Sequence, residues 1–170
     1  ERFQAWDNNS LEILLEKYLQ GIFAICFRLC QDTDDANDIT QDVCLKIMKY
    51  LGSFKRESEL KTWIYRIAYN ESLQFLQSKK EYIDIEIVEP YLDQDDTYEI
   101  DSRDAEVVVR SSIDRLPPLD KSIILFFYYD DLRIREIAEI MQMNENTIKT
   151  RLSRAKQFLQ PYLETLWKHL

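Results

Sequence analysis

Glycine and proline are scarce in this chain, with two glycines and four prolines among 170 residues. Sheet-rich folds need frequent tight turns, and these two residue types supply the backbone conformations that such turns require. Hydrophobic residues make up 45% of the chain, which is enough for a packed core. The sequence therefore predicts an all-α fold of long helices, in one ordinary domain or two small ones.

Apolar residues recur at three- and four-residue spacing over most of the chain, as amphipathic helices require. We expect the acidic turn at Asp32 to cap a helix and Gly52 to end it. We also expect a helix to start at Pro117 and Pro118, because proline is tolerated in the first turn. The predicted helices lie within 10–31, 32–54, 54–80 after an initial polar loop, the stretch from about 104, 115–132, and 133–159, where two short helices are joined by a turn.

The acidity of the chain is concentrated in one short segment. Its net charge is −9, and residues 81–103 alone hold one basic and nine acidic side chains. Isoleucines alternate with acidic residues over 83–87, which indicates extended chain. The sequence thus predicts two small helical domains, 1–80 and 104–170, joined by an acidic extended linker over 81–103. Because local field decides where phosphate binds, the net charge does not exclude a nucleic-acid partner.

Several function classes are disfavoured by what the sequence lacks. The longest apolar run, "IILFFYY" at 123–129, is too short to span a membrane, and no secretory leader is visible. Three cysteines and a single histidine predict reduced thiols and no metal site. No nucleophile–base pair or phosphate-binding glycine loop is found. We expect a cytoplasmic, non-enzymatic protein with no catalytic residues, no cofactor and no small-molecule substrate.

A basic segment, "NENTIKTRLSRAKQFL" at 144–159, carries four positive charges and one negative. With Asn144 as N-cap, it forms the second helix of a predicted helix-turn-helix, after the polar turn "QMNEN". Its apolar stripe is expected to face the core: Ile148, Leu152, Ala155 and Leu159. The outward face then presents Glu145, Asn146, Lys149, Thr150, Ser153, Arg154 and Lys156. Such side chains can reach phosphates and base edges, although a solvated amphipathic helix remains the alternative.

Three motifs occur in order along the chain: "DDANDITQDVCLKI", "FKRESELKTWIYRIAYNESLQFL" and "LPPLDKSIILFFYYDDLRIREIAEIMQMNENTIKTRLSRAKQFL". In this order they resemble regions 2.2, 2.3 with 2.4, and 4 of the extracytoplasmic-function group of the bacterial sigma-70 family. The resemblance covers essentially the whole chain, and the ordered set is more specific than any one motif. It implies a region 2 bundle over 1–80 and a region 4 helix-turn-helix over 104–170.

The resemblance also implies three binding sites. The site for core polymerase comprises Asp38, Gln41, Asp42 and Lys46. The site for the −10 element comprises Arg56, Glu57, Ser58, Leu60, Lys61, Trp63, Arg66 and Asn70. The site for the −35 element comprises Asn146, Lys149, Thr150, Arg151, Ser153, Arg154 and Lys156. Arg133 and Arg135 are expected to touch the DNA backbone.

Two of these residues and the linker carry alternatives. Arg56 stands where many family members have glycine. Trp63 is either a core residue or a platform on which an unstacked base stacks. The linker, which resembles a segment that threads through polymerase channels, is either a mimic of the phosphate backbone or a solubilising acidic spacer.

The function implied by the resemblance is that of a promoter-specificity subunit. Such a protein binds core RNA polymerase, recognises promoter DNA at its −35 and −10 elements, and nucleates melting. The resemblance also implies an anti-sigma factor as partner, which can be membrane-anchored and hold the chain at the inner face of the membrane. The alternatives are a helix-turn-helix regulator that acts without polymerase and a helical adaptor that has lost DNA binding.

Overall fold

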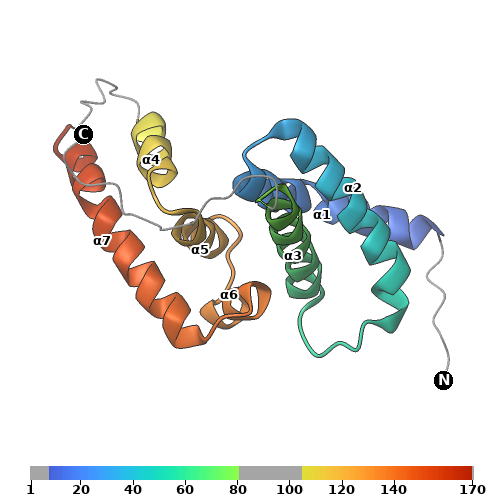
Figure 1. Cartoon of the computed structure of the whole chain (residues 1–170). Helices are drawn as coiled ribbons and strands as arrows, with labels where there is room; N and C mark the ends of the chain where they lie inside the picture. The colour runs from blue at the N-terminus through green and yellow to red at the C-terminus, as the bar shows by residue number, and fades with distance from the viewer. Residues whose placement is uncertain (1–7, 81–104, 170) are drawn as a thin grey trace. The chain divides into compact units, whose positions relative to one another are not determined.

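The computed structural model describes residues 8–80 and 105–169, and every regular element within them is helical (Figure 1). The prediction of an all-α fold is therefore confirmed. The predicted extended linker, 81–103, lies outside the described residues. The elements are α1 (Asn8–Cys30), α2 (Thr33–Tyr50), the 3₁₀ helix η1 (Leu51–Ser53), α3 (Leu60–Lys80), α4 (Ala105–Asp114), α5 (Pro118–Tyr128), α6 (Ile134–Met141) and α7 (Glu145–His169).

The chain divides into two compact units. The first spans Glu1–Ile85 together with Arg135–Met143, and the second spans Glu86–Ile134 together with Asn144–Leu170. Among the described residues, the first unit thus holds α1, α2, α3 and nearly all of α6, and the second holds α4, α5 and α7. The predicted domains, 1–80 and 104–170, stay a prediction.

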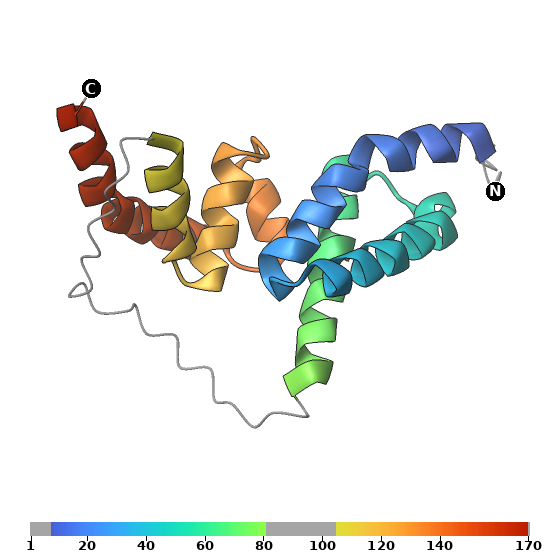
Figure 2. The same cartoon turned by 90° about the horizontal axis from the view of Figure 1, so that it is seen from above.

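In the first unit α1, α2 and α3 pack against one another as a small bundle, in which α3 (green) crosses α1 and α2 (blue to cyan) in Figure 2. Fully buried isoleucines from α1 and α3, among them Ile22, Ile25 and Ile64, form its core. Gly21 of α1 faces Tyr65 of α3, and a Cβ added at Gly21 would lie 2.2 Å from the Tyr65 hydroxyl oxygen. The missing side chain is therefore what lets these two helices approach so closely.

The two ends of α2 have different physical causes. At its start, the Asp32 carboxylate accepts a hydrogen bond of 2.9 Å from the Asp35 amide, which confirms the predicted acidic cap. At its end the helix stops at Tyr50, just before Gly52, but Gly52 does not adopt a left-handed conformation. Instead the buried Leu51 continues the chain into η1, so a 3₁₀ turn and not a glycine cap ends the helix.

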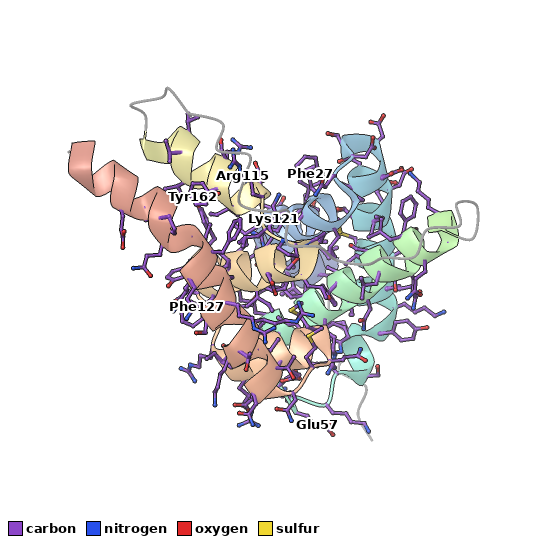
Figure 3. The ribbon with its side chains drawn as sticks, turned by 60° about the vertical axis from the view of Figure 1, so that its left-hand side comes forward. Phe27, Glu57, Arg115, Lys121, Phe127 and Tyr162 are labelled. Carbon is purple, nitrogen blue, oxygen red and sulfur yellow. The ribbon has the colours of Figure 1, made fainter. Side chains whose placement is uncertain are left out.

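In the second unit α4 and α5 both pack along α7. Pro117 is the N-cap of α5 and Pro118 is its first residue, which confirms the predicted start. The apolar stripe of α7 is buried as predicted, over Ile148, Leu152, Ala155 and Leu159. Figure 3 shows Arg115 next to Tyr162 of α7, and the Arg115 guanidinium donates a hydrogen bond of 3.3 Å to the Tyr162 hydroxyl.

The segment between α6 and α7 has the short polar turn that the sequence predicts. Helix α6 ends at Met141 and α7 begins at Glu145. Gln142, the residue after α6, adopts a left-handed φ of 54°, a conformation that is common where helices end. The Asn144 side-chain oxygen accepts a hydrogen bond of 2.8 Å from the Asn146 amide, so Asn144 caps α7 as predicted.

Candidate nucleic-acid interface

The outward face of α7 carries the predicted polar set fully exposed. All seven side chains are exposed to solvent: Glu145, Asn146, Lys149, Thr150, Ser153, Arg154 and Lys156. The helical repeat places them opposite the buried stripe, which anchors the helix and fixes the direction in which they point. Neither Lys149 nor Arg154 has an ion pair within the described part of the chain, so both charges are available to an external anion.

Two side chains on this face are held by local contacts. The Thr150 hydroxyl donates to the Asn146 carbonyl oxygen at 2.9 Å, which leaves its methyl group and its lone pairs outward. The Lys156 ammonium lies 5.1 Å from the ring centre of Phe127 and 5.4 Å from that of Tyr128, both on α5. Phe127 lies along α7 in Figure 3. Lys156 is thereby restrained without losing its charge.

A shallow hollow of about 440 Å³ adjoins Lys156 on the second unit. Its walls are Tyr128, Ser153, Lys156, Gln157, Gln160, Leu163 and Glu164. Tyr128 and Leu163 are large apolar side chains that remain exposed there. The hollow therefore extends the polar face of α7 with a partly apolar surface.

Arg151 does not share the outward face. It is half-buried, and its Nη1 donates a hydrogen bond of 3.0 Å to Oδ1 of Asp120, the third residue of α5. The Asp120 carboxylate is itself almost fully buried. The structure thus separates Arg151 from the other six residues predicted for the −35 element.

Arg56, in the loop between η1 and α3, has a strained backbone conformation. Its φ is 57°, in the left-handed region that glycine occupies without a steric penalty. Arg56 adopts this conformation at a cost of about 1–2 kcal/mol. Arg56 and Glu57 are exposed, whereas Ser58 is half-buried; Glu57 is labelled on this loop in Figure 3.

The first turn of α3 holds its polar and aromatic side chains against the protein. Leu60 opens the helix and is half-buried. The Lys61 ammonium lies 5.4 Å from the ring centre of Tyr65. Trp63 is half-buried, and its ring centre lies 5.3 Å from that of Phe54. The Trp63 ring therefore packs against Phe54 of the loop, and its part in binding an unstacked base stays a prediction.

Arg66 and Asn70 lie one turn apart on α3, and both already have partners within the first unit. The Arg66 Nη1 lies 3.4 Å from Oε1 of Glu139. The Asn70 side-chain oxygen accepts a hydrogen bond of 3.3 Å from Gln142. A nucleic acid that binds these two side chains would have to replace these contacts.

The predicted polymerase-binding residues on α2 fall into two groups. Asp38, Gln41 and Asp42 are exposed, as predicted. Lys46 is half-buried, and its ammonium lies 2.5 Å from Oε2 of Glu71 on α3, so it is engaged inside the unit. Sequence reasoning missed the exposed apolar side chains on the same helix. The signal was that they fall outside its apolar stripe.

These missed side chains are Leu45, Met48 and Tyr50, of which Leu45 is 62% exposed. Apolar side chains beside exposed carboxylates are the composition of a protein-binding surface with a polar rim. The surface of α2 therefore suits a protein partner better than a nucleic acid. On α3, by contrast, the aromatic side chains of Tyr65 and Tyr69 are buried in the bundle.

Further cations lie at the end of α3 and at the start of α6. Lys79 forms an ion pair with Asp35, and the hydrogen bond from Lys79 to that carboxylate raises the pKa of Lys79 above its ordinary value. Arg133 and Arg135 are both exposed at the start of α6.

Within residues 8–80 and 105–169, no group of three or more His, Cys, Asp or Glu side chains could hold a metal ion. The cysteines Cys26, Cys30 and Cys44 are free. No helix of the described segments has the length and apolar character needed to cross a membrane.

Comparison with known proteins matches both halves of the chain. The family model described as Sigma-70 region 2 matches residues 14–82, and the one described as Sigma-70, region 4 matches residues 107–159. The RNA polymerase sigma factor SigV of Bacillus subtilis strain 168 is 30% identical over 146 residues, which cover 83% of this chain and 83% of SigV. The ECF RNA polymerase sigma factor SigW of the same bacterium is 26% identical over 175 residues, covering 94% of this chain and 92% of SigW.

A solved structure has the same fold. It contains the sigma factor RpoE in complex with the anti-sigma factor NepR from Bartonella quintana, and its similarity to this chain has a TM-score of 0.68. The sequences are 23% identical, and the match covers 92% of this chain and 98% of that one.

Proposed function

Because this chain belongs to the extracytoplasmic-function group of the sigma-70 family and is an RNA polymerase sigma factor, we propose a role for each of its surfaces in transcription initiation. The outward face of α7 binds the −35 element, the loop and face of α3 bind and open the −10 element, and α2 binds core polymerase. Polymerase performs the chemistry, so the chain itself is not an enzyme. The observation that carries the proposal is the exposed, uncommitted pair of cations, Lys149 and Arg154, on an anchored helix.

The −35 element is read in the major groove, which admits one α-helix. Lys149 and Arg154 reach phosphates or guanine edges, whereas Asn146 and Thr150 suit adenine edges or a thymine methyl. Each well-formed bidentate base contact contributes about 1–3 kcal/mol of discrimination. Because the buried stripe of α7 is already packed, these side chains need no refolding to bind.

The −10 element is bound by the loop at Arg56 and by the adjoining face of α3. Melting requires that an unstacked base be captured and that the single strand be held by charge. We place Arg56, Glu57, Ser58 and Leu60 at the captured base, and Lys61, Trp63, Arg66 and Asn70 along the strand. Arg66 and Asn70 exchange their contacts with Glu139 and Gln142 for contacts with DNA.

Core polymerase binds the exposed face of α2. Asp38, Gln41 and Asp42 supply charge pairs and hydrogen bonds that fix register, while Leu45 and Met48 supply apolar area. We take residues 1–80 and 104–170 as the two functional domains. Their partners are core polymerase, promoter DNA and an anti-sigma factor, which can hold the chain at the inner face of the membrane. The protein then works in the bacterial cytoplasm, where polymerase is.

The experiment that tests this function is promoter selection with and without core polymerase. The purified chain is incubated with bacterial core enzyme and a pool of upstream DNA fragments, and the recovered fragments are tested for permanganate-reactive thymines. We expect the chain to recover fragments only when core enzyme is present. These fragments should share two spaced motifs and have a melted patch near the downstream motif. Binding of unmelted duplex DNA by the chain without polymerase would favour the simple helix-turn-helix regulator.

A matched pair of variants separates the sigma factor from an adaptor. Lys149→Ala combined with Arg154→Ala removes two charges from the outward face of α7. Lys17→Ala combined with Arg110→Ala removes two charges from exposed positions on α1 and α4. The first pair should abolish promoter recovery and the second should leave it intact. An adaptor would tolerate both pairs.

A further inference from the structure

Asp120 is unusual among the acidic residues of the chain. Only 1% of its surface is exposed, and within the described residues it is the one charged side chain that is buried. It lies in the first turn of α5, where the helix dipole favours a negative charge. Its Oδ1 accepts the hydrogen bond of 3.0 Å from Arg151 of α7. A buried carboxylate held in this way ties two helices of the second unit together at one point.

The geometry of α7 shows what this contact controls. An α-helix turns by about 100° per residue, so Arg151 lies about 160° around the axis from Ser153. Arg151 therefore sits beside the buried stripe, near Ile148 and Ala155, and not on the outward face. A rotation of α7 that turned Arg151 outward would also leave the Asp120 carboxylate buried without this partner.

Because a rotation of α7 that separates Arg151 from Asp120 is unfavourable, the contact between them selects one rotation of the helix. A buried charge whose partner is removed is strongly unfavourable, whereas the intact pair contributes less to stability than to selecting one arrangement. The guanidinium is planar and presents its donors in a fixed fork, so it constrains direction as well as distance. The pair therefore acts together with the buried stripe and selects one rotation of α7 about its own axis with respect to α5.

We propose that Asp120 and Arg151 are positioning residues, which set the side chains of α7 that face the −35 element and so determine its base preference. Arg151 acts through the orientation of α7 and does not contact DNA. This inference rests on the proposed function, because it presumes that the outward face of α7 reads a promoter. The opposite possibility is that Arg151 leaves Asp120 and binds a phosphate.

The two possibilities differ in salt dependence and in base discrimination. A lost phosphate contact lowers the slope of log K against log salt concentration by about one and weakens all sequences alike. A misoriented helix keeps its phosphate-binding charges but loses the match between side chains and bases. The experiment therefore measures affinity at several salt concentrations for the selected promoter and for promoters with single −35 substitutions.

The test uses the full chain bound to core polymerase, with Asp120→Asn and Arg151→Met made singly and together. We expect each single variant to lose about tenfold in discrimination, within the range of one base contact, with the salt slope of the wild type. We expect the double variant to lose no more than either single one. Discrimination that survives in Asp120→Asn, with a salt slope lowered by about one in Arg151→Met, would overturn the inference.

Matched variants control for charge and for folding. Lys121 and Asp114 form an ion pair in the same unit, 2.5 Å apart, with Asp114 exposed. Asp114→Asn and Lys121→Met should leave discrimination unchanged. Lys149→Ala should lower the salt slope, because that residue is placed on the DNA.

Asp120→Gln combined with Arg151→Gln replaces the pair by two amides without charge, and the extra methylene at position 120 offsets part of the shorter side chain at position 151. This variant is designed to keep a hydrogen bond between α5 and α7, so it tests the inference even where a single variant does not fold. Positioning predicts discrimination close to that of the wild type and an unchanged salt slope in this double variant. A direct contact predicts a slope lowered by about one. If the wild-type holoenzyme selects no two-element promoter, the proposed function falls and this inference with it. If it does select one and the variants behave as a direct contact requires, this inference alone is wrong.

Discussion

The two candidate DNA-binding surfaces of this protein are built in opposite ways. On α7 the outward cations Lys149 and Arg154 have no ion pair among the described residues. Arg151, on another side of the helix, donates a hydrogen bond to Asp120 of α5. On α3 the polar side chains proposed for the −10 element already have partners, such as Glu139 for Arg66 and Gln142 for Asn70. One surface is presented ready for a ligand, and the other must first release internal contacts.

This difference fits the two tasks that we propose. Reading a duplex requires a fixed constellation of side chains that matches the groove, and any ordering on binding would cost affinity. Opening a duplex is a step with a barrier, and side chains that exchange partners contribute only after the strands separate. The comparison can be tested by variants that alter one surface or one unit at a time.

The largest effect is expected on the outward face of α7. Lys149→Ala combined with Arg154→Ala removes two contacts of about 1–3 kcal/mol each, so promoter affinity should fall by about 100-fold or more. Arg66→Ala combined with Asn70→Ala should cost only about tenfold, because those side chains give up internal contacts when they bind. Holoenzyme binding to a selected promoter measures both. Equal losses from the two pairs would show that the two surfaces do not differ in the way described.

The next effect concerns the packing that supports the α3 surface. Gly21→Ala brings a methyl group against Tyr65, and overpacking of about 1–3 kcal/mol outweighs the helix propensity of about 1 kcal/mol that alanine returns. The free energy of unfolding of the first unit should therefore fall by up to about 2 kcal/mol. Amide exchange of α1 and α3 during urea titration measures this change separately from α7.

Two controls accompany this variant. Gly52→Ala meets no atom within 4 Å, so it should be neutral or slightly stabilising. Tyr65→Phe added to Gly21→Ala removes the nearest atom and should recover part of the loss. Faster exchange in α7 to the same extent would mean that the two units do not unfold independently.

A smaller effect is expected at the loop that leads into α3. Arg56→Gly relieves a left-handed residue at a gain of about 1–2 kcal/mol, against an unfolded-state entropy cost of about 0.4–1 kcal/mol. The net result should be a slight stabilisation. The neighbouring Lys55 has no positive φ, so Lys55→Gly should destabilise by about 0.5–1 kcal/mol. Urea unfolding measures the stability change of each variant. A change of the same sign in both variants would contradict backbone strain at Arg56.

The smallest effect is a pH dependence of the first unit. Burial of Cys26 in the bundle raises the pKa of its thiol above the ordinary value of 9.0, so the folded state favours the protonated form. That contribution to stability is fully present below pH 9 and is lost as the pH rises from 9.0 toward the folded pKa. Unfolding measured from neutral to alkaline pH should show this loss, and Cys26→Ala should reduce its slope. An unchanged slope would assign the alkaline loss to other groups.

The helical class, the two faces of α7 and the caps at Asp32 and Asn144 could all be predicted from the sequence alone. Each of these depends on residues within a few positions of one another. The repeat of 3.6 residues decides which side of a helix is buried, and a cap bonds to an amide two or three residues away. The family motifs could be recognised for the same reason, since they are short and continuous.

Which polar side chains form contacts with other helices could not be predicted from the sequence and follows from the tertiary structure. Arg151 turned out to pair with a residue 31 positions away, and Arg66 with one 73 positions away. The burial of Tyr65 likewise depends on the space that Gly21 leaves on another helix. A periodic pattern shows which side chains of a helix face inward, but it does not show which distant residue each of them contacts. Partnership between helices is set by packing, and packing is a property of the folded chain.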